Sequence, residues 1–277
     1  MRLAVLADIH SNHYALEACV SWMKQQNIDG IIFAGDYVSD CPYPQETMRL
    51  IRQLRESYQT WFVRGNREEI MLKGSQGDVK WNCHQGSLAY TCDNLTQHDI
   101  EFFQSLPMTQ VIEFEGYPPV SVSHGDLHNS RGQVRPGNDC MAKLLEEMKT
   151  TLHICGHSHH PFIYEADHKI VLNPGSVGVP VSGFPQAEMA VIESDGQCWK
   201  PSLLRLDYDI ESAIREFQTS GLSDVSGVWG RCIIALLQTG RHYCEECMKR
   251  IQILAKETGR DPSDPVLWQQ AADELGV

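Results

Sequence analysis

The chain has 277 residues, of which 42% are hydrophobic and 21% are charged, and these proportions are typical of a soluble globular protein. Its formal net charge of −13 argues against a general nucleic-acid-binding surface. No apolar run approaches the roughly 20 residues that a transmembrane helix needs, so we expect no contact with a membrane. The length allows one large domain, or one domain with an appendage.

The N-terminal segment and the cysteines favour a cytoplasmic protein. The first apolar stretch runs only from Leu3 to Ala7, whereas a secretory signal peptide needs roughly 7–15 apolar residues. The ten cysteines are irregularly spaced, and most lie in apolar or helical contexts. We therefore expect reduced thiols and no disulfide framework.

The first two thirds of the chain alternate short apolar runs with segments of helical periodicity. The pattern predicts strands at residues 3–7, 31–34, 60–63, 120–123, 152–155, 170–172 and 189–193. It predicts helices at residues 13–26, 44–57, 86–94, 97–105 and 139–149. Several strands are apolar throughout, as in sheets that are covered on both faces. This alternation of strands and helices indicates a layered α/β fold.

The pattern changes after about residue 206, where the strand signals end. Helices are predicted at residues 207–219, 228–239, 243–258 and 262–275, with glycines between them. We therefore divide the chain into an α/β domain, residues 1–206, and a small helical C-terminal appendage, residues 207–277.

Five short polar clusters, each directly after an apolar run, carry most of the functional information. Ligands of open α/β sheets bind at the carboxyl ends of strands, and each cluster follows a predicted strand. A single cluster of this kind is an ordinary turn sequence, but five of them at strand ends predict a common site. The clusters are Asp8-Ile9-His10, Gly35-Asp36, Gly65-Asn66-Arg67, His124-Gly125-Asp126 and Gly156-His157-Ser158-His159.

The side chains of these clusters are suited to two divalent metal ions. Carboxylate, imidazole and amide ligands without thiolate favour manganese or iron, with zinc, cobalt or nickel as alternatives. Two such ions clamp a phosphate group for in-line displacement, and water held between them becomes the nucleophile near neutral pH. The expected ligands are Asp8, His10, Asp36, Asn66, His124, His157 and His159.

The clusters, in this order, resemble those of the calcineurin-like metallophosphoesterases over about residues 1–195. The resemblance implies a four-layer α/β/β/α sandwich. It also implies a partition of the ligands: Asp8, His10, Asp36 and His159 on one metal, with Asn66, His124 and His157 on the second and Asp36 bridging. The opening Asp-Ile-His-Ser-Asn, the Gly-Asn-Arg-Glu block and the helical tail resemble small prokaryotic phosphodiesterases and hydrolases of dinucleoside polyphosphates such as diadenosine tetraphosphate.

Arg67 departs from the commonest family pattern, in which a histidine follows the Gly-Asn pair and assists the leaving group. Arginine is not a general acid near neutral pH, but it binds phosphate bidentately and stabilises developing charge. We therefore expect either an acid from elsewhere, with His128 as the candidate, or a leaving group that departs with little protonation. The second case favours phosphodiesters and phosphoanhydrides over alkyl phosphomonoesters.

Three further residues are candidates for substrate binding. Arg131 and Arg135 follow His124 and are expected either to grip outer phosphates or to form a solvated basic loop. Asn12 is expected either to position the substrate phosphate or to cap the helix that starts at His13. The segment 173–176 is expected to be a turn.

Two patterns in the helical tail have structural interpretations. His242, Cys244 and Cys247 lack the fourth ligand of a structural zinc site, so we expect them to contribute to helix packing and to the surface. A helical stripe is predicted to be either core or a subunit contact, which leaves a homo-oligomer open. This stripe consists of Trp229, Ile233, Leu236 and Leu237.

These features together predict a dinuclear metal-dependent phosphoesterase. The expected substrates are phosphodiester or phosphoanhydride bonds of nucleotides or dinucleoside polyphosphates, so the expected partner is a small phosphorylated molecule. A protein phosphatase acting on phosphoserine or phosphothreonine is the alternative, and a non-catalytic scaffold is disfavoured because all seven ligand positions are filled. The predicted catalytic residues are Asp36, Asn66, Arg67 and His128.

Overall fold

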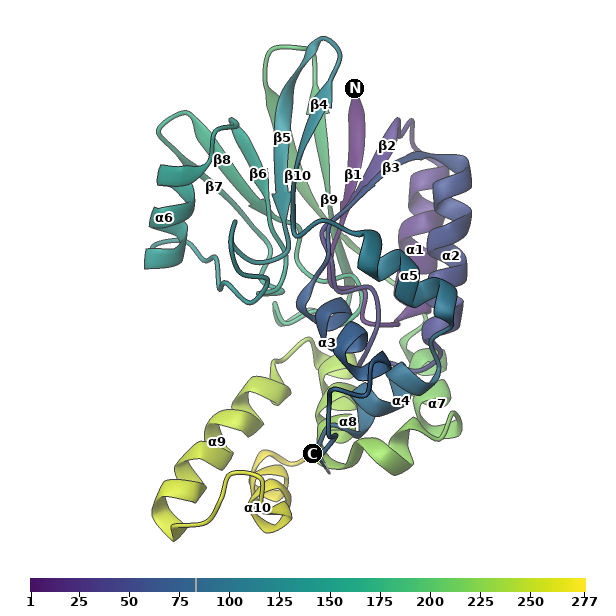
Figure 1. Ribbon diagram of the computed structural model, residues 1–277, viewed down its shortest axis with the longest axis vertical. Coiled ribbons are helices and arrows are strands. Elements are labelled where there is room, and N and C mark those ends of the chain that lie inside the picture. Colours follow the sequence, from purple (N-terminus) through teal and green to yellow (C-terminus); the bar gives the residue numbers. More distant parts are fainter. Residues whose placement is uncertain (83) are drawn as a thin grey trace.

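A computed structural model describes residues 1–82 and 84–277, and two five-stranded sheets form its centre (Figure 1). The first sheet has the order β10-β9-β1-β2-β3, in which β1, β2 and β3 are parallel and β9 and β10 are antiparallel additions. Its strands are β1 (Arg2–Leu6), β2 (Gly30–Phe33), β3 (Gln59–Phe62), β9 (Ala187–Ser194) and β10 (Trp199–Leu206).

The second sheet has the order β4-β5-β6-β8-β7, with a parallel centre and an antiparallel strand at each edge. Its strands are β4 (Thr109–Phe114), β5 (Tyr117–Ser123), β6 (Leu152–Ile154), β7 (Phe162–Ala166) and β8 (Lys169–Asn173).

The two sheets pack face to face. Side chains along β1 point alternately toward the second sheet and toward the helices. Leu3 and Val5 lie in a core that includes Val120 and Val122 of β5, so they point toward the second sheet. Ala4 and Leu6 lie in a different core, which faces the helices. Because β1 is covered on both faces, its sequence is apolar throughout.

Helices cover both outer faces of the sheet pair and complete four α/β/β/α layers, so the predicted fold class is confirmed. On the first sheet lie α1 (His13–Lys24), α2 (Pro44–Ser57) and α5 (Gln97–Ser105) (Figure 1). On the second sheet, α6 (Asp139–Glu147) packs Met141 and Leu144 against Val171 of β8. Two further helices, α3 (Asn66–Ser75) and α4 (Gly86–Asp93), lead from the first sheet to the helical tail.

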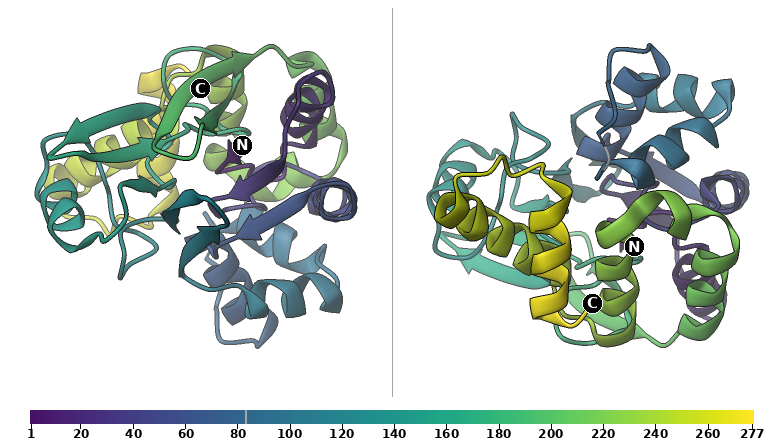
Figure 2. Two further views of the ribbon diagram at one scale, coloured as in Figure 1. Left: turned by 90° about the horizontal axis from the view of Figure 1, so that it is seen from above. Right: turned by 90° about the horizontal axis from the view of Figure 1, so that it is seen from below.

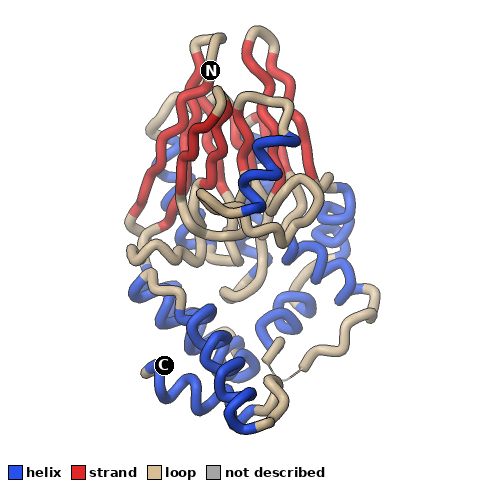
Figure 3. Tube along the Cα trace, turned by 90° about the vertical axis from the view of Figure 1, so that its left-hand side faces the viewer, coloured by secondary structure: helices blue, strands red, loops and turns tan. Residues whose placement is uncertain are grey.

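The tail lies beneath the carboxyl ends of the central strands (Figure 2, Figure 3). It contains α7 (Ile210–Thr219), α8 (Leu222–Thr239), α9 (Tyr243–Thr258) and α10 (Pro265–Leu275). These helices have their own apolar core, which also takes in Cys41, Val179 and Val181 from loops below the sheets. The predicted stripe is therefore mainly core: Ile233, Leu236 and Leu237 are buried in it, together with Cys232, Cys244 and Cys247.

The structure adds four elements that the sequence pattern did not predict: β4, β7, β10 and α3. The strands β4, β7 and β10 are edge strands with many exposed side chains, so their sequences lack a continuous apolar run. Helix α8 begins at Leu222, earlier than predicted, and bends at Gly227, where φ is 53°. No helix of the described residues is long and apolar enough to cross a bilayer. The division into two domains at residue 206 stays a prediction.

Replacing Phe217 with Ala should lower the free energy of unfolding by about 3–5 kcal/mol, because this fully buried ring of α7 fills the core of the tail. Phe184→Ala is the matched control, since the Phe184 side chain is 48% exposed and its loss should cost less than about 1 kcal/mol. Urea denaturation of both variants would measure the difference. Equal losses would contradict the packing described here.

Candidate metal centre

The five polar clusters meet below the carboxyl ends of β1, β2, β3, β5 and β6, as the sequence predicts. Five of the predicted ligands have positive φ angles, an uncommon conformation for residues other than glycine: Asp8, His10, Asp36, His157 and His159. Such conformations cost on the order of 1–3 kcal/mol each and are concentrated at functional sites. The surrounding fold holds the loops in place; the hydroxyl of Ser176 and the N–H of Gly178, for example, both donate to the carbonyl of Asp8.

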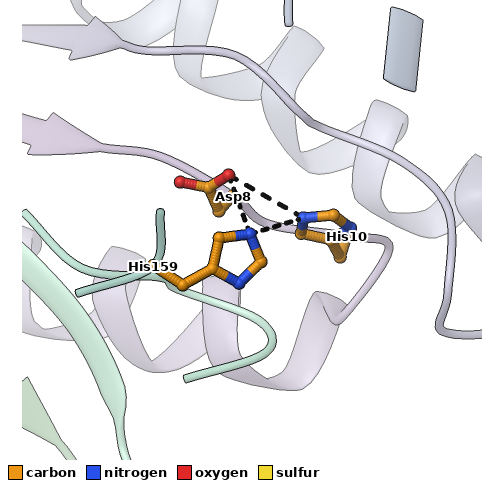
Figure 4. Close-up of side chains that lie close together, drawn as sticks. All are labelled: Asp8, His10 and His159. Carbon is orange, nitrogen blue, oxygen red and sulfur yellow. Dashed lines mark hydrogen bonds and ion pairs between the residues drawn. The ribbon is translucent and has the colours of Figure 1, made fainter. Parts of the chain in front are cut away.

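Asp8, His10 and His159 form the first ligand group (Figure 4). The Nε2 atom of His159 lies 3.1 Å from Oδ1 of Asp8 and 3.3 Å from Nε2 of His10. The distance from Nε2 of His10 to Oδ1 of Asp8 is 3.8 Å. The three ligand atoms therefore face a common point.

Asp36, His124 and His157 form the second group, and Asn66 lies beside them. Nε2 of His124 lies 3.3 Å from Oδ2 of Asp36 and 3.2 Å from Oδ1 of Asn66. The same Oδ2 atom of Asp36 lies 3.7 Å from Nε2 of His10 in the first group. Asp36 thus lies between the two groups, which is the position that a bridging carboxylate requires.

Hydrogen bonds to the other ring nitrogen orient three of these histidines. Nδ1 of His124 lies 2.8 Å from the carbonyl of Ala34, and Nδ1 of His159 lies 3.1 Å from the carbonyl of Val179. Nδ1 of His10 lies 2.9 Å from the carboxylate of Asp40. Since a carbonyl or carboxylate accepts a hydrogen bond from each Nδ1–H, each Nε2 presents a lone pair to the ligand groups.

This donor set fits divalent cations. Oδ1 of Asp8 is buried and accepts no hydrogen bond among the described residues, although two imidazole nitrogens face it. Lone pairs that face one another at such distances repel unless a positive charge lies between them. The donors are nitrogen and oxygen atoms without thiolate, which suits the metals expected from the sequence.

The pKa values of the side chains in the two ligand groups also indicate that positive charge stabilises the site. Burial lowers the pKa of His124, but Asp36, Asp8 and the carbonyl of Ala34 together outweigh burial and raise that pKa to about 10. Burial likewise opposes protonation of His10, yet its hydrogen bond to Asp40 helps raise the pKa to about 9. Burial raises the pKa of Asp8, but His159 and its neighbours bring that pKa well below the usual range. Cations would supply the charge that protons supply in their absence.

Asp40 is a buried residue of the site that the sequence analysis missed. Its carboxylate accepts from Trp229 Nε1 at 2.8 Å and pairs with Arg67 Nη2 at 2.9 Å, in addition to the contact with His10. It therefore fixes the ring of His10 and the guanidinium of Arg67 together. No motif marks it, since it lies four residues beyond Asp36 in an irregular loop.

Glu68 is the second residue that the sequence analysis did not assign. Its buried carboxylate accepts backbone hydrogen bonds from Asp36, Tyr37 and Gly65 at 2.8–2.9 Å, which joins the loops after β2 and β3. Burial, together with the charge of Asp36, raises the pKa of Glu68 to about 7. The available signal was the glutamate three residues after Gly65, because a glutamate at the third position of a helix accepts from the backbone N–H of the N-cap residue.

A cavity of about 580 Å³ opens in front of the ligand groups, and two of the predicted substrate-binding arginines lie in its wall. Arg67 and Arg135 each have a buried Nε atom without a hydrogen-bond partner among the described residues. His242 and Cys244 of the helical tail also line this cavity. The tail thus forms one wall of the site.

Three predicted site residues are not brought to this cavity. His128 is 77% exposed and pairs with Glu147 at 2.5 Å in a separate surface depression, outside the cavity in front of the ligand groups. Arg131 is exposed and does not line the cavity, which leaves the solvated loop as its interpretation. Asn12 is buried: its Oδ1 caps α1 and its Nδ2 donates to the carbonyl of Gly178, so it is a structural residue.

The segment 173–176 is more than a turn. Nδ2 of Asn173 donates to the carbonyl of Gly156 at 2.7 Å, and Ser176 holds the backbone of Asp8, as described above. The segment therefore supports two of the ligand loops from behind.

Comparison with known proteins agrees with this geometry. The model of the calcineurin-like phosphoesterase superfamily domain matches residues 1–197, which is more than half of the chain. The chain belongs to this superfamily. The resemblance noted in the sequence is thereby confirmed, and a metallophosphoesterase hydrolase is the activity that the family supports.

The similarity to individual proteins extends beyond the matched domain into the helical tail. An uncharacterized protein of Methanocaldococcus jannaschii is 27% identical over 240 residues, which cover 81% of this chain and 95% of that protein. A metallophosphoesterase from Sphaerobacter thermophilus has a similar structure, with a TM-score of 0.71, 24% identity and coverage of 87% of this chain and 100% of that one. A hypothetical protein from Pyrococcus horikoshii gives a TM-score of 0.75 at 20% identity, over 86% and 98% of the two chains. The two structures share the fold.

Asp40→Asn should weaken metal binding about 10- to 100-fold, because the variant loses the carboxylate that orients His10. Titration calorimetry with Mn²⁺ would measure this change. Asp93→Asn, at an exposed position on α4, is the matched control and should bind Mn²⁺ like the unaltered protein. Unchanged affinity in Asp40→Asn would contradict the orienting role.

Proposed function

We propose that this protein is a dinuclear metal-dependent phosphoesterase that hydrolyses phosphodiester or phosphoanhydride bonds of nucleotides or dinucleoside polyphosphates. The observation that carries the proposal is the position of Asp36 between two ligand groups, at the floor of a cavity with two arginines in its wall. Two divalent ions bound there would activate a water molecule and neutralise the phosphoryl oxygens. Manganese and iron suit the nitrogen and oxygen donors, with zinc, cobalt and nickel as alternatives.

The residues of the chain would position the substrate around this centre. Asp36 is held by the backbone N–H of Arg67, which donates to Oδ1 at 2.7 Å and leaves Oδ2 toward both ligand groups. The guanidinium of Arg67 is anchored through Nη2 to Asp40, so its position is set before substrate arrives. A positioned cation of this kind stabilises the charge that develops on the phosphoryl oxygens. Arg135 would bind an outer phosphate of a longer substrate.

The cavity favours leaving groups that need little protonation. Arg67 occupies the position after Asn66, and arginine stays charged near neutral pH. Burial, with His159 nearby, lowers the pKa of His242 to about 4, so this cavity residue is neutral near pH 7 and carries no proton to release as an acid. Phosphate and aryloxide leaving groups depart without such help, whereas alkoxides do not.

Asp36→Asn should reduce turnover of bis-p-nitrophenyl phosphate with Mn²⁺ at least about 10³-fold, because both ligand groups lose the shared carboxylate. Asp93→Asn is again the matched surface control and should keep full turnover. Circular dichroism of both variants would show that the fold is intact. Near-normal turnover by Asp36→Asn would exclude the proposed mechanism.

The substrate class can be tested with a panel at equal concentration of Mn²⁺. Diadenosine tetraphosphate and bis-p-nitrophenyl phosphate should be hydrolysed at least about 100-fold faster than glycerol 2-phosphate and a phosphoserine peptide, since the latter two have alkoxide leaving groups. Phosphate release and chromatography of the nucleotide products would give the rates. Faster hydrolysis of the phosphopeptide would instead support a protein phosphatase.

A further inference from the structure

A second cavity of about 310 Å³ lies next to the metal centre. It shares Asp40, Arg67 and Trp229 with the larger cavity, so these three residues form a common wall. Its other lining residues come from segments far apart in sequence, namely the loop before α4, α4 itself, α9, the loop before α10 and α10. No part of the proposed reaction accounts for it.

The lining of this second cavity includes aromatic and apolar side chains. The rings of His84 and Trp268 stack with centroids 3.9 Å apart and an interplanar angle of 7°. Hydrogen bonds hold both rings: His84 Nε2 lies 2.8 Å from the carbonyl of Ser263, and Trp268 Nε1 donates to the carbonyl of Pro262 at 2.9 Å. Leu88 and the partly exposed Met248 add apolar surface. Rigid rings and aliphatic groups of this kind are suited to a flat, apolar ligand.

Polar groups also line the cavity: Asn82 and Gln85 supply carboxamides, whose oxygens accept the backbone N–H groups of His84 and Asn82, respectively. The amide N–H groups of such carboxamides donate to acceptor atoms at the edge of a heteroaromatic ring. The volume, about 310 Å³, is within the range of small-molecule sites. A planar ring with polar edges therefore matches the lining better than an alkyl chain does.

The common wall places the second cavity beside the residue that would bind the reacting phosphate. Trp229 donates through Nε1 to Asp40 at 2.8 Å, and Asp40 holds Arg67 at 2.9 Å. A phosphate bound by Arg67 at the metal centre would thus have one of its substituents directed past Trp229 toward the second cavity. The lining suits a planar ring with polar edges, and the wall shared with Arg67 suits a ring that is attached to a phosphate.

We propose that the second cavity is a nucleobase subsite, which binds the base of a nucleotide whose phosphate lies at the metal centre. This inference rests on the proposed function and assigns its substrate class to defined residues. Stacking on aromatic side chains strengthens binding roughly 5- to 150-fold per base. The subsite therefore acts chiefly on affinity and KM, whereas the metal centre sets kcat.

Calorimetric binding of adenosine 5′-monophosphate and ribose 5-phosphate to the Mn²⁺-loaded protein tests the subsite, because the two ligands differ only by the base. The unaltered protein should bind the nucleotide at least tenfold more tightly. Trp268→Leu should reduce that ratio below threefold, and Trp22→Leu, at a half-buried tryptophan on α1 outside both cavities, should preserve it. Phenyl phosphate serves as a third ligand and should bind no better than ribose 5-phosphate.

A second pair of variants tests the same cavity independently, in case Trp268→Leu does not fold. Met248 and Met108 are 37% and 36% exposed, and only Met248 lines the cavity. Met248→Ala should lower the ratio at least twofold, whereas Met108→Ala should leave it unchanged. Thermal melts of all four variants would accompany the titrations.

The outcomes separate this inference from the proposed function. Equal affinity for the nucleotide and the sugar phosphate, or no measurable nucleotide binding at millimolar concentration, would overturn the subsite even if bis-p-nitrophenyl phosphate is hydrolysed. Phenyl phosphate that binds as tightly as the nucleotide would also overturn it, in favour of a general aryl site. A tenfold ratio without hydrolysis of any diester would instead support the subsite and contradict the proposed reaction.

Discussion

The arrangement of the site depends on a convergence of lone pairs that is stable only with positive charge between them. Nε2 of His10 and of His159 lie 3.3 Å apart, and both face the buried Oδ1 atom of Asp8. In the second ligand group, Oδ2 of Asp36 and Oδ1 of Asn66 likewise face Nε2 of His124. Because carbonyl and carboxylate acceptors bind the opposite nitrogens of three rings, the rings are held in this orientation.

The fold provides the rigidity that this arrangement needs. Ligand residues with positive φ angles are strained, and the strain is tolerated because the loops extend from strands that are buried on both faces. Glu68 joins two of the loops, and Ser176 and Asn173 support others. The helical tail completes the site, since α8 and α9 contribute walls to both cavities. In the proposed function, the sandwich supplies the chemistry and the tail supplies selectivity.

The sequence was sufficient to predict the elements whose signals are local and the polar side chains that the fold brings together. Central strands buried on both faces appear as continuous apolar runs, and the ligands follow them directly. The edge strands β4, β7 and β10 lack that signal because much of their side-chain surface is exposed.

Contacts between segments that are distant in the sequence leave no local pattern, so the sequence did not predict them. Asp40 acquires its role from His10 and from Trp229, which lies 189 residues away. Arg131 and Arg135 look alike in sequence, yet only the path of the loop decides that Arg135 reaches the cavity. His128 faces Glu147 of α6 instead of the site, which also follows from packing.

Electron paramagnetic resonance of the protein loaded with two equivalents of Mn²⁺ tests the central claim most directly. If Asp36 bridges two sites, the ions should lie roughly 3.5–4 Å apart and give a spin-coupled spectrum. Asp36→Asn should remove the coupling and leave the spectrum of isolated ions. A spectrum of isolated Mn²⁺ in the unaltered protein, at full occupancy of two ions per chain, would contradict the account.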